Sequence, residues 1–113
     1  MEKNFIKNID FAVALTLADL VSYQLGQVVS KTLAQNTAVS LTLFAFDEGE
    51  EISSHESNGD AMVIALDGEG EITIGTEKHH VTAGETIVMP AKTPHAVYAS
   101  QQFKMFLIVV FPS

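Results

Sequence analysis

The chain has 113 residues and a formal net charge of −8 at pH 7, from six basic and fourteen acidic side chains. This length supports one domain with a self-supporting core, and the negative charge disfavours binding to nucleic acid or to anionic membranes. The absence of cysteine excludes disulfides, thiolate catalysis and cysteine-ligated zinc. Charged residues make up only 18% of the chain, against roughly 25% in typical domains, which favours self-association.

Residues 1–24 form an N-terminal segment for which the pattern leaves two structures open. Residues 17–21 have the pattern of one helical turn, whereas residues 11–17 are compatible with an edge strand. The apolar run over 11–17 is far shorter than the roughly 20 residues that a membrane helix needs. It also lacks the basic start of a secretory signal, and we therefore expect a cytoplasmic protein.

Residues 25–113 have the pattern of an all-β domain. Apolar and polar side chains alternate over 39–46, which predicts a strand with one more apolar face. A short strand over 62–66 is expected to end at the turn dipeptide Asp67-Gly68. The run over 103–111 is apolar on both faces except for Lys104, which predicts a strand that is central or pressed against a partner. Short strands separated by turns indicate a sandwich or barrel, without choosing between them.

Two signatures narrow that choice. Each opens on a glycine and contains a histidine: Gly49, His55 and Gly68 in the first, Gly84, Pro90 and His95 in the second. Their spacing resembles the two motifs of the cupin superfamily over residues 38–110, although Lys92 stands where the second motif has a glycine. The resemblance implies a small β-barrel of the jelly-roll type (a double-stranded β-helix) in residues 25–113, and a homodimer.

The resemblance also implies a metal site that is incomplete in this chain. Cupin motifs place histidines and a glutamate around a transition metal. Here the second histidine position is Ser57 and the glutamate position is Ala61. Asp60 is one place away, and a shift of one residue on a strand turns the side chain to the other face. The remaining candidates, His55 and His95, are fewer than the three protein ligands typical of catalytic zinc or iron.

The motifs predict a ligand pocket inside the barrel, but no catalytic residue. Its expected lining is His55, Ser57, Met62, Met89, His95 and Tyr98. The function favoured by the depleted ligand set is the binding of a small molecule, of unassigned activity. One alternative is a dioxygenase or isomerase for a small acid or sugar derivative, with a divalent transition metal on the two histidines. The other is a non-catalytic sensor or interaction module.

Two further groups of polar residues are expected to lie outside any site. His79 and His80 are neighbours on a strand, so their side chains face opposite ways and cannot chelate one ion together. Glu48, Glu50 and Glu51 form an acidic loop that is expected to be solvated.

Overall fold

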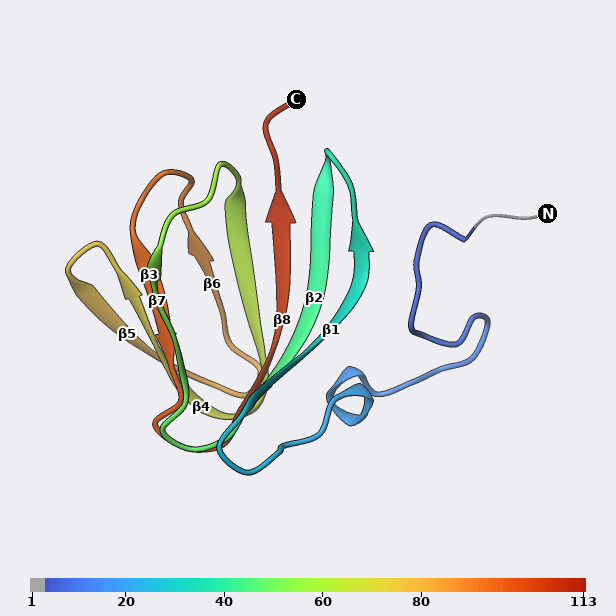
Figure 1. The fold of residues 1–113 in the computed structure, drawn as a ribbon, viewed down its shortest axis with the longest axis horizontal. Helices are drawn as coiled ribbons and strands as arrows, with labels where there is room; N and C mark the ends of the chain where they lie inside the picture. Colours follow the sequence, from blue (N-terminus) through green and yellow to red (C-terminus); the bar gives the residue numbers. More distant parts are fainter. Residues whose placement is uncertain (1–3) are drawn as a thin grey trace.

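The structure is a computed structural model that describes residues 4–113, so residues 1–3 of the predicted N-terminal segment lie outside the described part. The described residues contain eight strands and one short 3-10 helix, arranged as a curled barrel (Figure 1). The elements are η1 (Leu17–Leu20), β1 (Val28–Gln35), β2 (Val39–Phe46), β3 (Glu51–His55), β4 (Asp60–Ile74), β5 (Glu77–Thr82), β6 (Thr86–Met89), β7 (His95–Tyr98) and β8 (Phe103–Val110). The predicted all-β jelly-roll barrel is confirmed.

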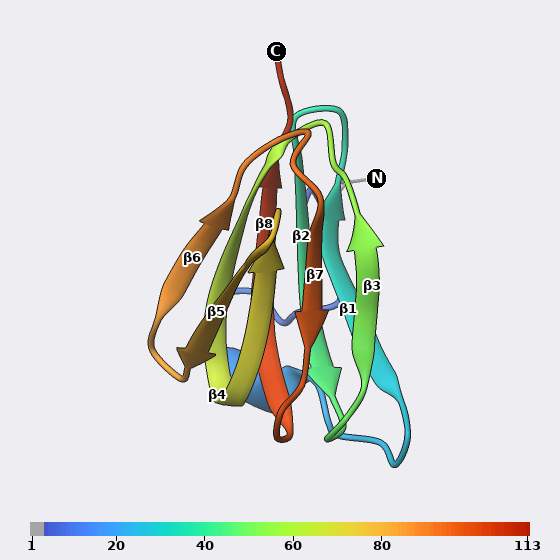
Figure 2. The same ribbon diagram turned by 90° about the vertical axis from the view of Figure 1, so that its left-hand side faces the viewer.

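The barrel consists of two sheets that share the long strand β4 (Figures 1 and 2). The first half of β4 pairs with β8 and β6, and β2 and β1 continue that sheet beyond β8; we call it sheet A. The second half of β4 pairs with β5 and β7, and β3 pairs with β7; we call it sheet B. Strand β8 lies between β2 and β4, so the strand that is apolar on both faces is a central one.

The bend of β4 replaces a turn that the sequence predicts. The strand runs through Asp67 and Gly68 and shifts register between Ala65 and Asp67. Gly68 has φ +72°, and a Cβ there would lie 1.7 Å from the backbone oxygen of Gln102. The expected end of the strand at Asp67-Gly68 is therefore wrong. The glycine and the bulge carry one continuous strand from sheet A into sheet B.

The end of the barrel at this bend, which we call the closed end, is filled by large side chains. Phe46, Ile72 and Phe103 are fully buried there, and the ring centroids of Phe46 and Phe103 lie 5.9 Å apart. Gly70 allows this packing, because a Cβ at that position would lie 2.7 Å from the ring of Phe103. The opposite end, at the β3–β4 and β6–β7 loops, is the open end.

The N-terminal segment crosses the outer face of sheet A. Residues 11–17 form no strand, and the helical turn lies at η1. Val21 is buried against Leu33, Leu43 and Ala45 of β1 and β2. The Lys104 ammonium donates to the carbonyl of Ala18 at 2.6 Å. Among residues 4–113 there is no helix long and apolar enough to cross a membrane.

Candidate functional site: a histidine pair over an apolar pocket

Two histidines meet at the open end of the barrel. Strands β3 and β7 pair antiparallel, and the pairing sets His55 directly opposite His95. Their Nε2 atoms lie 3.1 Å apart, with the rings in a T-shaped arrangement. His95 is buried, whereas His55 is exposed. The pair therefore lies at the boundary between the barrel interior and the protein surface. The backbone N–H of Lys92 donates to the carbonyl of Ser57 at 2.8 Å and ties together the two loops beside the pair.

Backbone contacts favour one tautomer in both rings. Nδ1 of His55 lies 2.9 Å from the carbonyl oxygen of Ser53, and Nδ1 of His95 lies 3.0 Å from that of Thr93. A carbonyl oxygen only accepts, so these two contacts favour the tautomer with its hydrogen on Nδ1 in each ring. In neutral rings the two Nε2 lone pairs then face each other. A hydrogen-bond donor or a cation at this point would therefore be stabilised by both rings.

Burial favours the neutral form of one ring of the pair. Desolvation is the largest influence on the pKa of His95 and lowers it below the ordinary histidine value. The hydrogen bond to Thr93 acts in the opposite direction, and the nearby charge of His55 lowers the pKa further. Burial thus favours the neutral form of this ring, in which one ring nitrogen accepts a hydrogen bond.

A cavity of about 250 Å³ lies beneath the pair, between the two sheets. Four of the predicted lining residues border it: His55, Ser57, Met89 and His95. Met62 and Tyr98 do not, and their prediction is wrong: they are 39% and 41% exposed on the outer faces of β4 and β7. Successive residues of a strand point to opposite faces, so the neighbours of Met62 and Tyr98 take the inward positions.

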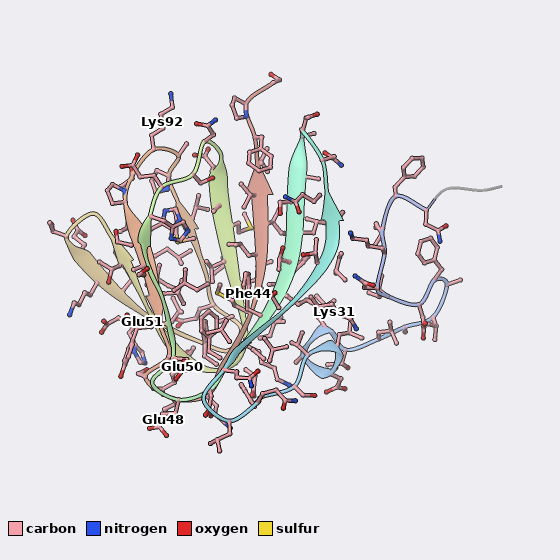
Figure 3. All side chains as sticks on the ribbon, viewed as in Figure 1. Lys31, Phe44, Glu48, Glu50, Glu51 and Lys92 are labelled. Carbon is pink, nitrogen blue, oxygen red and sulfur yellow. The ribbon has the colours of Figure 1, made fainter. Side chains whose placement is uncertain are left out.

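The sequence reasoning missed most of the apolar lining. These residues are Phe44, Ile52, Ala61, Val97, Met105, Leu107 and Val109. Alternation along the strands predicts several of these residues. Val97 comes two residues after the inward-facing His95 and therefore faces inward too. Ala61 occupies the inward position of the family's glutamate. Figure 3 shows Phe44 inside the barrel, with Glu48 and Glu50 at the closed-end loop.

The residues at the other ligand positions of the family are poorly suited to bind a metal. Ser57 and Ala61 border the cavity, but the Ser57 hydroxyl accepts from the backbone of Gly59 and Ala61 has no donor atom. The carboxylate of Asp60 points away and accepts from the backbone N–H of Ala91 at 2.8 Å. Within residues 4–113 no group of three or more histidine or acidic side chains is placed to hold a metal. Of the family's ligand positions, only those of His55 and His95 carry a histidine here.

The other histidines are bound to carboxylates elsewhere on sheet B. Nε2 of His80 lies 3.2 Å from Glu69, and Nε2 of His79 lies 3.9 Å from Glu77. His80 is exposed and His79 is half-buried. The two do not join into one site.

The barrel, the shared bent strand and the histidine pair at its open end together define a cupin domain. The family model for the cupin domain matches residues 42–111, and this chain belongs to that family. Comparison with curated proteins finds no match.

Solved structures of similar proteins agree with the family. A conserved protein of unknown function from Streptococcus pyogenes is 46% identical, with a TM-score of 0.96 over 98% of this chain and 97% of the other. A cupin superfamily protein from Desulfitobacterium hafniense is 34% identical, with a TM-score of 0.90 over 95% and 98% of the two chains. A cupin 2 conserved barrel domain protein from Leptotrichia buccalis is 41% identical, with a TM-score of 0.83 over 85% of this chain and 47% of the other.

Proposed function

We propose that this cupin binds a small molecule whose apolar body lies between the sheets and whose polar head meets the histidine pair. The observation that carries the proposal is the 3.1 Å separation of the Nε2 atoms of His55 and His95 at the end of an otherwise apolar cavity. Where both rings carry their hydrogen on Nδ1, the two facing Nε2 acceptors repel each other unless a donor lies against them. A hydroxyl or acid group entering the pocket would supply that donor.

The size and lining of the cavity define the class of ligand. A cavity of about 150 Å³ is enough to hold benzene, so the 250 Å³ here has room for a ring or branched chain with one small polar group. Met89 and Met105 line the cavity, and their flexible side chains adapt to ligand shape. Because His55 is exposed and His95 is buried, the ligand would enter past His55.

Phenol and toluene test the proposal because they are similar in size, but only phenol has a hydroxyl group that can donate a hydrogen bond. The probe signals are the methionine methyl resonances, with Met89 and Met105 inside the barrel and Met62 outside as an internal control. We expect phenol to shift the two inner signals saturably and to bind about 2- to 12-fold more tightly than toluene, as one hydrogen bond provides.

The variant His55→Phe should reduce the preference for phenol, because it removes one of the two acceptors, whereas the matched control His80→Phe should keep it. His80 is an exposed histidine that lies away from the pocket. The proposal is wrong if neither probe shifts the inner methionines, or if the wild-type protein binds phenol and toluene equally.

A metal-dependent enzyme is the second candidate, and one observation favours it. Two ligands that each bond an ion at about 2.0–2.1 Å lie roughly 3 Å apart, as the two Nε2 atoms do. His55 and His95 would hold the ion, and the bound molecule would have to complete its coordination. A divalent ion would supply polarisation of an oxygen on that molecule.

Equilibrium dialysis against Co²⁺ tests this second candidate. We expect one ion per chain in the wild-type protein, loss of the ion in His55→Ala and retention in His80→Ala. The variant Ser57→His, which adds a nitrogen at the family's second histidine position, should raise the affinity for Co²⁺ by at least about tenfold. Equal binding by wild type and His55→Ala would exclude the site.

A further inference from the structure

Ser57 is the one hydroxyl residue in the wall of the cavity, where it lies beside both histidines. Its backbone is held by the β6–β7 loop, because the N–H of Lys92 donates to its carbonyl at 2.8 Å. Its side chain is held as well, because Oγ accepts from the backbone N–H of Gly59 at 3.1 Å. Apart from the two histidines, the rest of the wall is apolar. The Ser57 hydroxyl is therefore a positioned polar group in an apolar wall.

Gly59 links this hydroxyl to the barrel itself. The glycine is buried. A Cβ added to it would meet the backbone oxygen of Val110 and would lie 2.9 Å from the side chain of Val109. The N–H of Gly59 is thus placed by strand β8, which also contributes Val109 to the cavity wall. The position of the Ser57 hydroxyl consequently depends on packing against β8 and not on the β3–β4 loop alone.

The hydrogen of the Ser57 hydroxyl is available to a ligand. A hydroxyl has one hydrogen to donate and two lone pairs that accept. The bond from Gly59 uses a lone pair, and within residues 4–113 the structure gives this hydroxyl no acceptor. A ligand oxygen would supply that acceptor in surroundings that are mostly apolar, where a hydrogen bond is stronger than in water. The pocket therefore offers a donor at Ser57 next to the acceptors at His55 and His95.

We propose that Ser57 makes the pocket selective for a carboxamide head, whose N–H donates to the histidine pair and whose carbonyl oxygen accepts from the Ser57 hydroxyl. This role of Ser57 rests on the proposed function, which places a ligand donor against the histidines, and it adds an acceptor on the same head. A primary amide carries a donor and an acceptor on one carbon and is uncharged. A hydroxyl head would have to donate and accept at a single oxygen.

The charges at the open end favour a neutral amide over a carboxylate. An ionised carboxyl group only accepts, so it would bring no hydrogen to the histidine pair. Burial, the hydrogen bond to Thr93 and the charge of His55 are the largest influences on the pKa of His95, and the carboxylate of Glu56 also acts on it. An anionic head at the pair would be repelled by that carboxylate.

Three probes of one branched shape separate the two contacts. Benzamide has both the N–H and the carbonyl, acetophenone has a methyl group in place of the NH₂ and keeps the carbonyl, and cumene has neither group. Each probe is titrated into the full-length protein, with the methyl resonances of Met89 and Met105 as the signals of binding. Each probe is compared between wild type and variant, so the cost of removing that probe from water cancels.

Ser57→Ala should weaken the binding of benzamide and of acetophenone about 2- to 12-fold, as the loss of one hydrogen bond predicts, and should leave the affinity for cumene unchanged. Ser57→Thr keeps a hydroxyl and should retain the affinity for both carbonyl probes. The matched control is Ser54→Ala, because Ser54 is an exposed serine of β3 outside the cavity wall. This control should bind all three probes as the wild type does.

His55→Phe tests the histidine contact separately. It should weaken the binding of benzamide and leave acetophenone unchanged, because acetophenone has no hydrogen to donate to the pair. Unchanged binding of benzamide in this variant would count against the proposed function, whatever the result at Ser57.

Circular dichroism verifies that each variant is folded before its affinities are interpreted. The selective role of Ser57 is overturned if Ser57→Ala binds acetophenone as tightly as the wild type does, or if it weakens cumene by the same factor. It is also overturned if Ser57→Thr loses as much affinity as Ser57→Ala, or if the wild-type protein binds neither carbonyl probe.

Discussion

The two ends of the barrel are built by the same strands and differ in what fills them. At the closed end Phe46, Phe103 and Ile72 are fully buried, and Gly70 is required because the ring of Phe103 occupies the place of a side chain. At the open end the same strands enclose a cavity of about 250 Å³ beneath a pair of histidines. The same set of paired strands thus encloses a packed core at one end and a pocket at the other.

The residues that determine the fold and the residues that line the pocket lie at different ends of the barrel. Gly68 bends β4 at the closed end, and substitutions there would meet backbone or aromatic ring. At the open end, Ser57 and Ala61 replace two family ligands while the strands around them keep their places. The barrel can therefore keep its fold while positions 57 and 61 differ from the family motif, because the packed aromatic core lies at the opposite end.

The largest expected effect is the loss of an aromatic ring at the closed end. Phe103→Ala should lower the free energy of unfolding by about 3–5 kcal/mol, because the ring is fully buried among packed neighbours. Met89→Ala at the open end should cost about 2 kcal/mol, because the methionine already borders a cavity. Chemical denaturation measures both. Equal losses would remove the distinction between the two ends.

Adding a methyl group tests the same contrast in the opposite direction. Gly70→Ala should destabilise the protein by about 1–3 kcal/mol, because its Cβ would lie 2.7 Å from the ring of Phe103. Ala61→Val adds two methyl groups on the cavity wall and should change stability by less than about 1 kcal/mol. Thermal melting of the two variants is the measurement. A greater loss for Ala61→Val would show that the open end is as tightly filled as the closed end.

A smaller effect is expected in the open-end loop at Lys92, where φ is +62°. The left-handed conformation costs a non-glycine residue about 1–2 kcal/mol, and the greater freedom of unfolded glycine offsets about 0.5–1 kcal/mol of this. Lys92→Gly should therefore raise the free energy of unfolding by about 0.5 kcal/mol. A decrease, measured by urea denaturation, would mean that the Lys92 side chain stabilises the loop.

The smallest effect concerns the turn between β5 and β6 and depends on pH. The backbone N–H of Thr82, and then its hydroxyl, donate to Glu85 and lower the pKa of that carboxyl below 4.5. A depressed carboxyl pKa contributes stability above the ordinary value, and this contribution disappears as the pH falls through the lowered value. The wild type should therefore melt above Glu85→Gln at pH 7 and together with it in strong acid. A difference independent of pH would contradict this.

The sequence predicts the barrel and the meeting of the two histidines better than it predicts the pocket wall. His55 and His95 were found because their motifs fix turns and strands on both sides. Tyr98 was misplaced although alternation from His95 puts it outside, and Met62 was misplaced for the same reason beside Ala61. Nearness in a motif does not decide whether a side chain faces the barrel interior, whereas alternation along the strand does.

Other features had no signal in local sequence. Asp67-Gly68 has the composition of a hairpin turn, and only the approach of Gln102 from a distant part of the chain makes it a bend within one strand. The register shift between Ile52 and His55 likewise depends on pairing with β7. Such features follow from tertiary contacts, which periodicity along one strand does not encode.

The central claim is that both histidines offer an unprotonated Nε2 to the open end of the pocket. The most direct measurement is the ¹⁵N chemical shift of the ring nitrogens of His55 and His95 in ligand-free protein above neutral pH. We predict protonated Nδ1 and unprotonated Nε2 in both rings, the tautomer that their contacts to Ser53 and Thr93 favour. An Nε2–H on either ring would contradict the account, because the pair would then satisfy itself and leave no place for a donor.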